Sequence, residues 1–242
     1  MIKGIISKII KKKNPNFTFD EVLDTQILGS FFIQKLWSTI LSWRILFYGK
    51  IPYLLFLGRG VRFFNIKNIV FGKWVQLEDH VFLSALGKSS LELGNNVRIG
   101  AFSRLIISTS FNNIGNHIRI GNNVGIGEFA YLGGAGGLEI GNDCIIGQYF
   151  SCHPENHQFG DTNKLIRLQG VSRKGIKVGD NCWIGAKVTI LDGVTIGSNC
   201  VIAAGAVVTK SMPKGSLIGG VPAKVLKTID ENEEIHAHLN LV

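Results

Sequence analysis

Two of the six histidines stand four residues apart in the segment HPENH, as His153 and His157. The ordinary pKa of histidine is about 6.5, so at neutral pH its imidazole can accept a proton from an alcohol. Glu155 and Asn156 lie between the two rings and Asp161 follows, and a carboxylate or backbone carbonyl can orient an imidazole through its second nitrogen. These residue types favour general-base catalysis of a transfer to a hydroxyl. The simpler interpretation is a pair of solvated histidines.

The sequence around the histidines carries a six-residue repeat. Aliphatic residues recur at Val178, Ile184, Ile190, Ile196, Ile202 and Val208. Mostly small apolar residues stand four positions later, at Cys182, Val188, Val194, Cys200, Ala206 and Met212. The same period occurs earlier, at Leu93, Ile99, Leu105, Ile114, Ile120, Ile126, Leu132, Ile140 and Ile146. An α-helix repeats near 3.6 residues and a strand near 2, so this period predicts an all-β fold, a parallel β-helix of hexapeptides with about 18 residues per coil.

The repeat is interrupted three times. Two breaks, from Leu105 to Ile114 and from Leu132 to Ile140, add only two or three residues each. The third is long, because no repeat resumes between Cys152 and Ile176. Long excursions from a regular framework are usually functional or disordered. Since this one, the loop 153–175, holds both histidines and four basic residues, we expect it to carry the active site.

The two ends of the chain lie outside the repeat. Residues 1–50 are basic and then apolar, and they predict a helix that either caps the first coil or lies on an anionic membrane. No secretory signal is evident, and the apolar run 27–43 is interrupted by polar residues, which argues against a membrane span. We expect the β-helix domain over 51–222, and a tail over 223–242 with a short polar helix at 223–239.

Composition narrows the choice of partners. The net charge of +9 favours phosphate-bearing cofactors, acidic lipid or nucleic acid. Cys144, Cys182 and Cys200 occupy the small inward position of the repeat, and no CxxC pair is present, so we expect buried thiols and no metal. Free thiols suit a reducing compartment, which predicts a cytoplasmic protein, peripheral to the membrane if the N-terminal helix binds it.

The stretch VGDNCWIGAKVTILDGVTIGSNCVIAAGAVVTKSMPKGSLIGGVPAKVLK, residues 178–227, resembles the hexapeptide-repeat acetyltransferases. The nearest resemblance is to the maltose and galactoside O-acetyltransferases and to the O-acetyltransferases of polysaccharide biosynthesis. It implies a left-handed β-helix, acetyl-CoA as co-substrate, and a homotrimer with active sites between neighbouring subunits. It also implies that the catalytic base is the histidine five residues beyond Cys152, which is His157, with Asn156, Glu155 and His153 in support. His153 precedes Pro154, as the family histidine precedes a proline, but its spacing differs.

The same resemblance implies the residues that would bind acetyl-CoA. Small residues would let the pantetheine arm approach the backbone, and a hydroxyl and cations would hold the nucleotide end. An outward Trp183 would form a groove wall or a subunit contact. The expected set is Trp183, Gly185, Ala186, Ala204, Gly205, Thr209, Lys210, Lys224 and Lys227. Each lysine alone is equally consistent with a solvated surface charge.

We therefore expect an acetyl-CoA-dependent O-acetyltransferase that modifies a sugar hydroxyl by direct attack on the thioester. The acceptor would be a lipid-linked or nucleotide-linked precursor of surface polysaccharide. Glu128, Tyr131 and Arg167 are candidates for its pocket. Acetylation of an antibiotic or of an amino-sugar nucleotide is the alternative. Two other functions fit the three lysines of the expected cofactor set less well. One is a γ-carbonic-anhydrase-like hydratase that uses His117, His153 and His157, and the other is a non-enzymatic binding solenoid. No nucleic-acid-binding module is recognised, so that partner is not expected.

Overall fold

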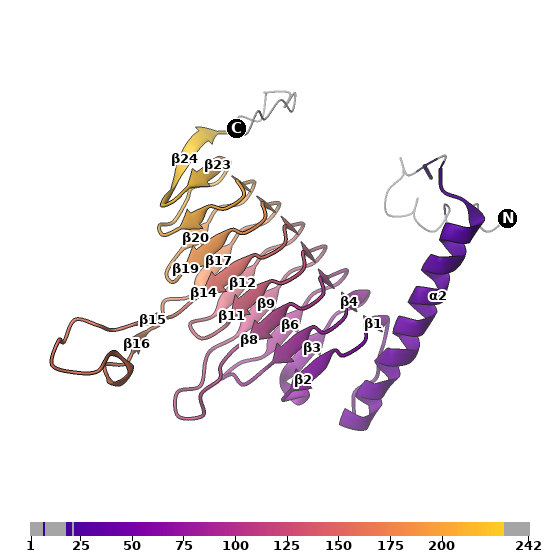
Figure 1. Ribbon diagram of the computed structural model, residues 1–242, viewed down its shortest axis with the longest axis horizontal. Coiled ribbons are helices and arrows are strands. Elements are labelled where there is room, and N and C mark those ends of the chain that lie inside the picture. Colours follow the sequence, from indigo (N-terminus) through magenta and orange to yellow (C-terminus); the bar gives the residue numbers. More distant parts are fainter. Residues whose placement is uncertain (1–6, 8–17, 21, 230–242) are drawn as a thin grey trace.

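The computed structural model describes residues 7, 18–20 and 22–229. Short strands stack in register along one axis, with the helix α2 (Thr25–Ser42) at one end of the stack and β24 at the other (Figure 1). A 3-10 helix, Trp43–Tyr48, connects α2 to the first coil. The basic residues predicted to precede α2, which are Lys3, Lys8, Lys11, Lys12 and Lys13, lie outside the described residues.

The strands form three walls, named A, B and C in the order in which each coil visits them. Wall A consists of β1 (Leu55–Leu57), β4 (Val75–Leu77), β7 (Arg98–Ile99), β10 (Gly125–Ile126), β13 (Ile145–Ile146), β18 (Trp183–Ile184), β21 (Val201–Ile202), β23 (Ser216–Gly220) and β24 (Ala223–Thr228). Wall B consists of β2 (Arg62–Phe64), β5 (Phe82–Ser84), β8 (Arg104–Ile106), β11 (Tyr131–Gly133), β14 (Ser151–His153), β19 (Thr189–Leu191) and β22 (Val207–Val208). Wall C consists of β3 (Ile69–Phe71), β6 (Leu91–Leu93), β9 (Ile118–Ile120), β12 (Leu138–Ile140), β17 (Ile176–Val178) and β20 (Thr195–Ile196).

The six-residue repeat fills the space between the walls, as predicted. The aliphatic positions from Val178 to Val208 are at most 4% exposed, and the small positions from Cys182 to Met212 are also buried. Each aliphatic side chain removed from water in this way contributes about 1.5–3 kcal/mol. All four cysteines are free and buried, which confirms the assignment of three of them to the core. Trp183 is half exposed, so it does point outward.

Two corners of each coil are turned by residues in the left-handed backbone region. At the corner between walls C and A these are Asn and Asp, as the repeat predicts: Asn96, Asn123, Asp143, Asn181 and Asn199 have φ of 53–60°. At the corner between walls A and B, called the A–B corner, the same backbone shape is adopted by His80, Phe102, Phe129, Tyr149 and Lys187. The aromatic rings there stack at 5.0–5.2 Å, which offsets part of the backbone cost.

The strand register locates the insertions. A regular coil has 18 residues, as between Trp183 and its partner Val201. Ile145 pairs with Trp183, 38 residues later, which confirms the long excursion after β14. Arg98 pairs with Gly125, 27 residues later, so the first break adds about nine residues rather than two or three. The aliphatic Ile114 had disguised this break, because it lies in the inserted segment and not in a wall.

The C-terminal tail differs from the prediction. Residues 223–228 form β24, a strand antiparallel to β23, and not the start of a helix. β23 is the last parallel strand of wall A, and its free edge leaves backbone groups that a reversing chain can satisfy. That pairing outweighs the weak helical preference of the tail. The rest of the expected helix, from residue 230, lies outside the described residues.

In the described part of the chain, no helix has both the length and the apolar character needed to cross a bilayer.

Candidate active site

The loop 153–175 is held by a small hairpin of its own. It leaves wall B at the end of β14 and rejoins the coil at β17. Just after it leaves, β15 (Asn156–His157) pairs antiparallel with β16 (Val171–Ser172), with His157 opposite Val171. The hairpin is visible in Figure 1 as the arm projecting beside β14. His157 therefore sits at the base of the loop, where the backbone is fixed, and not at its tip.

Arg173 ties this loop to the other insertion, the segment 107–117 between β8 and β9. Its Nε donates to Glu155 Oε2 at 2.6 Å. Nη1 donates to Asn113 Oδ1 at 2.9 Å and to the Ile114 carbonyl at 3.2 Å, and Nη2 donates to the Asn113 carbonyl at 3.2 Å. The guanidinium is largely covered, with 19% of the side chain exposed. The two insertions thus form one unit at the corner between walls B and C, called the B–C corner.

A cavity of about 310 Å³ lies between the two insertions. Its wall includes both loop histidines, the charged pair Glu155 and Arg173, the phenol of Tyr131, and the hydroxyl-bearing run Ser108, Thr109 and Ser110. Its volume falls at the lower end of the range of small-ligand sites. The structure therefore brings together Tyr131, His153, Glu155 and His157 in one polar pocket.

The two histidines differ in their surroundings. The ring of His153 stacks on Tyr131 with centroids 5.5 Å apart, and burial lowers the pKa of His153 below its ordinary value. His157 is exposed at the cavity wall. Within the described residues, no hydrogen bond reaches the imidazole of either one. Glu155 is engaged by Arg173, and Asp161 pairs with Lys164 at 3.3 Å, so neither expected carboxylate orients His157.

Cys152 also borders the cavity but is fully buried. Burial raises the pKa of the Cys152 thiol well above its ordinary range. A thiol that stays protonated is a poor nucleophile. The cavity can therefore support general-base chemistry more readily than formation of an acyl-enzyme on this cysteine.

The small residues expected to contact acetyl-CoA lie at the A–B corner. Gly185 and Ala186 occupy it between β18 and β19, and Ala204 and Gly205 occupy it one coil later. A Cβ on Gly185 would stand 2.6 Å from the backbone nitrogen of Ala204, so coil stacking itself requires glycine there. Ala204 and Gly205 are exposed, and Gly185 and Ala186 are partly exposed.

In one chain this corner and the histidine pocket are far apart. His153 pairs with Leu191, which lies five residues beyond Ala186 along wall B. Five extended residues span roughly 16 Å. The expected catalytic histidines thus lie at one edge of wall B, and the small residues expected to contact pantetheine lie at the other edge.

The remaining expected cofactor residues lie on the C-terminal coils and are exposed. Thr209 and Lys210 follow β22 at the B–C corner, and Lys224 and Lys227 lie on β24. Trp183 stands on the outer side of wall A beside Ile145, which is also exposed.

The three histidines of the hydratase hypothesis do not converge in one chain. His117 Nε2 lies 3.3 Å from Glu139 Oε1 beside wall C, and the His117 side chain is only 13% exposed. No group of three metal-ligating side chains occurs among the described residues.

Comparisons with known proteins agree with the repeat pattern. Residues 175–210 match the bacterial transferase hexapeptide family (six repeats). Residues 175–210 thus carry the repeat that this family model describes. The chain is 29% identical over 200 residues to Rv3034c of Mycobacterium tuberculosis, which is named as an acetyltransferase. That match covers 79% of this chain and 57% of that protein. It is 26% identical over 149 residues to WbbJ of Escherichia coli, named as a lipopolysaccharide biosynthesis O-acetyl transferase, covering 59% of this chain and 70% of that one.

Among solved structures, AntD, an N-acyltransferase from Bacillus cereus in complex with dTDP and 3-hydroxybutyryl-CoA, superposes with a TM-score of 0.51. The identity is 17%, over 76% of this chain and 88% of that chain. At this level the likeness shows the fold, which is the left-handed parallel β-helix.

Several residues of the pocket had no clear sequence signal. Arg173 and Asn113 are 60 positions apart and belong to different insertions. The hydroxyl run at 108–110 lies in the insertion whose length the repeat count underestimated. Of the three acceptor candidates, only Tyr131 borders the cavity; Glu128 lies at the A–B corner and Arg167 in a 3-10 turn, Ile166–Leu168.

Proposed function

We propose that the protein is an acetyl-CoA-dependent O-acetyltransferase that modifies a sugar hydroxyl in the synthesis of surface polysaccharide. The observation that carries the proposal is the polar cavity at the B–C corner, which places His157 against a wall of hydroxyl groups. The likeness to WbbJ supports the substrate class, and the bound acyl-CoA of AntD supports the donor. In this proposal residues 51–222 are the catalytic β-helix, and 1–50 and 223–242 flank it.

The chemistry needs one base and no covalent enzyme intermediate. The imidazole of His157 takes the proton of the acceptor hydroxyl as its oxygen attacks the thioester carbonyl. A carbon–oxygen bond forms and the carbon–sulfur bond breaks. The proton held by His157 then passes to the leaving thiolate, so the enzyme returns to its starting state. The protonated Cys152 takes no part.

The acceptor occupies the 310 Å³ cavity. Ser108 is buried and its Oγ bonds within its own loop, accepting from the Ser110 N–H at 3.2 Å, so it shapes the segment. Thr109 and Tyr131 both border the cavity and are exposed, and each carries a hydroxyl group. Such groups suit the hydroxyl-rich edge of a sugar.

The active site is shared between subunits of a homotrimer. The roughly 16 Å between the A–B corner and His153 is too far for direct transfer within one chain. A closed ring of copies brings the A–B corner of one chain to the B–C corner of its neighbour. We place the reaction in the cytoplasm, where acetyl-CoA is made and buried thiols such as Cys152 stay reduced.

Release of CoA thiol from acetyl-CoA in the presence of candidate glycans tests the function. We expect His157→Ala to lower kcat by about 100-fold or more, the usual contribution of a general base. His153→Ala should act mainly on KM for the acceptor, and His80→Ala, at the A–B corner outside the cavity, should leave the rate unchanged. Turnover of His157→Ala at the unaltered rate would refute the assigned base. Absence of acetyl-CoA binding by the intact protein would refute the function.

A further inference from the structure

Helix α2 turns an apolar stripe away from the β-helix. The stripe consists of residues spaced three and four apart, which share one face of a helix, and it continues into the 3-10 turn. Its members and their exposed fractions are Ile33 71%, Leu36 64%, Ile40 52%, Trp43 64% and Phe47 93%. A surface helix ordinarily presents its polar side outward, whereas the exposed face of α2 is apolar.

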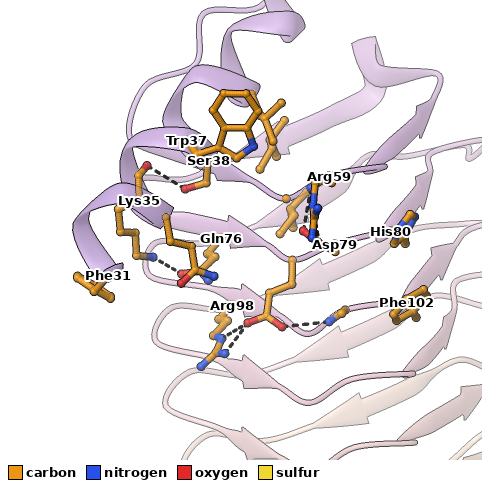
Figure 2. Close-up of a pocket in the computed structure, with 17 residues that line it drawn as sticks. Phe31, Lys35, Trp37, Ser38, Arg59, Gln76, Asp79, His80, Arg98 and Phe102 are labelled. Atoms are coloured by element: carbon orange, nitrogen blue, oxygen red, sulfur yellow. Dashed lines mark hydrogen bonds and ion pairs between the residues drawn. The ribbon is translucent and has the colours of Figure 1, made fainter. Parts of the chain in front are cut away.

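The opposite face of α2, which meets wall A, contains polar groups. Lys35 donates from Nζ to Gln76 Oε1, and Ser42 is buried with Leu28 and Ile45 on the same side. Figure 2 shows Lys35 directed toward Gln76. Both residues border a cavity of about 880 Å³ between the helix and the first coils. Arg59 and Arg98 border the same cavity. The inward face of α2 is therefore mixed, with Leu28 and Leu41 packed there beside the polar Lys35 and Ser42.

The segment that carries the stripe is basic. From residue 25 to residue 77 the chain has no Asp or Glu, and it has seven Lys and Arg. The acidic residues that follow, Glu78 and Asp79, pair with Arg98 and Arg59 at the cavity on the opposite side of the helix. Two of the lysines stand beside exposed apolar groups just after the stripe. Lys73 Nζ lies 5.6 Å over the ring of Tyr53, and a hollow bordered by Lys50 and Lys73 also contains Ile51 and Tyr53. Ile51 is 83% and Tyr53 63% exposed.

We propose that the α2 stripe, with Ile51 and Tyr53, is a docking surface for an anionic lipid bilayer. Aliphatic and aromatic side chains enter the boundary between headgroups and acyl chains, and Lys73 meets lipid phosphates. Lys50 donates from Nζ to the Ile69 carbonyl at 2.6 Å and so adds only its charge to the surface. A second copy of this chain fits the surface less well, because it would bring two acid-free, basic regions together. The proposal goes beyond catalysis, since it concerns the end of the solenoid opposite β24 (Figure 1).

Co-sedimentation of the full chain with vesicles tests the surface. We expect binding to vesicles of phosphatidylcholine mixed with phosphatidylglycerol, weak binding to phosphatidylcholine alone, and weaker binding at high salt. Phe47→Ser combined with Ile51→Ser should lower the partition coefficient at least about tenfold, since two exposed apolar side chains lose their place in the bilayer. Lys73→Glu should lower binding to the anionic vesicles only.

The matched control is Phe111→Ser, which removes an aromatic side chain of similar exposure, 77%, from the insertion at the B–C corner. It should bind vesicles as the intact protein does. Thermal unfolding of each variant shows whether the fold is retained. Unchanged vesicle binding by the Phe47/Ile51 variant would overturn the proposal. A second pair of results would also overturn it: the intact protein does not bind lipid, and the Phe47/Ile51 variant differs from it in oligomeric state by light scattering. The stripe would then join two copies of the chain.

Discussion

Replacing Arg173 with alanine should release the loop that carries His157 from the neighbouring insertion. The guanidinium is the point at which the two insertions meet, through Glu155 on one side and Asn113 and Ile114 on the other. Removing it leaves the Glu155 carboxylate, 29% exposed, without its cation. The Ile114 carbonyl loses its donor, and the Asn113 carbonyl keeps only the Ser108 hydroxyl at 3.5 Å.

The size of the effect follows from these contacts. A hydrogen bond between charged groups contributes about 1.5–3 kcal/mol, and the bonds to neutral acceptors contribute less because they are partly solvated. We expect a loss of about 2–4 kcal/mol in loop-to-loop association, which is about 30- to 1,000-fold in the local opening equilibrium. Global stability should change by only about 1 kcal/mol or less, because both insertions lie outside the β-helix core.

Hydrogen–deuterium exchange and kinetics measure the two consequences. Amides of segments 107–117 and 153–175 should exchange faster in Arg173→Ala, while the coil strands keep their protection. The kcat/KM for acceptor should fall at least about tenfold, because a displaced base costs rate even when the residue remains. Arg173→Lys should be intermediate, since an amine cannot reproduce the planar set of donors.

Arg167→Ala is the control, because it removes an exposed arginine from the same loop. If exchange in segment 107–117 is the same in Arg173→Ala and Arg167→Ala, the account of a clamp between the insertions is wrong.

Three further outcomes follow from the structure. Cys152→Ala should keep kcat within about threefold of the intact protein, because the buried thiol stays protonated. For the same reason iodoacetamide should not inactivate the intact protein. Inactivation would indicate a nucleophilic cysteine. Burial lowers the pKa of His153, so the folded state binds fewer protons than the unfolded state. The free energy of unfolding should therefore fall as the pH drops below the ordinary histidine pKa of 6.5. In Tyr131→Ala, which lacks the ring stacked on His153, an NMR titration should show the His153 pKa moving back up. Phe129→Ala should cost about 1–3 kcal/mol in a denaturant titration, because two ring pairs are lost, whereas Lys187→Ala, at the same kind of corner without a ring partner, should cost little.

The coil architecture could be predicted from the sequence because the apolar positions of each repeat mark the side chains that are buried. The regular spacing from Val178 to Val208 sets the walls, and the Asn and Asp corners supply the left-handed turns. The aromatic A–B corner could not be anticipated, since Phe102 and Tyr149 adopt that backbone only because their rings stack on neighbours from other coils. The strand at 223–228 likewise depends on a free edge that only the assembled stack provides.

The candidate site was predictable in part, because the regular repeat makes its interruptions visible. The long gap in the repeat pointed to His153 and His157, and the structure places both on one cavity. The opposite wall of that cavity comes from the other insertion, segment 107–117. The hydrogen bond from Arg173 to Asn113 joins the two insertions, and no local sequence pattern predicts it. Local sequence also could not show that wall B separates His153 from Ala186, because the register of β14 and β19 sets that distance.

Active-site complementation tests the central claim most directly. His157→Ala and Ala186→Trp would each be inactive alone, the first without its base and the second with a blocked pantetheine corner. Co-expressed with different tags and purified as mixed trimers, they should regain about one third of the thiol-release activity, because in every mixed trimer one of the three interfaces joins an intact pocket to an intact corner. Recovery at this level would support a site shared between subunits. No recovery in mixed trimers, or full activity of His157→Ala alone, would contradict the account.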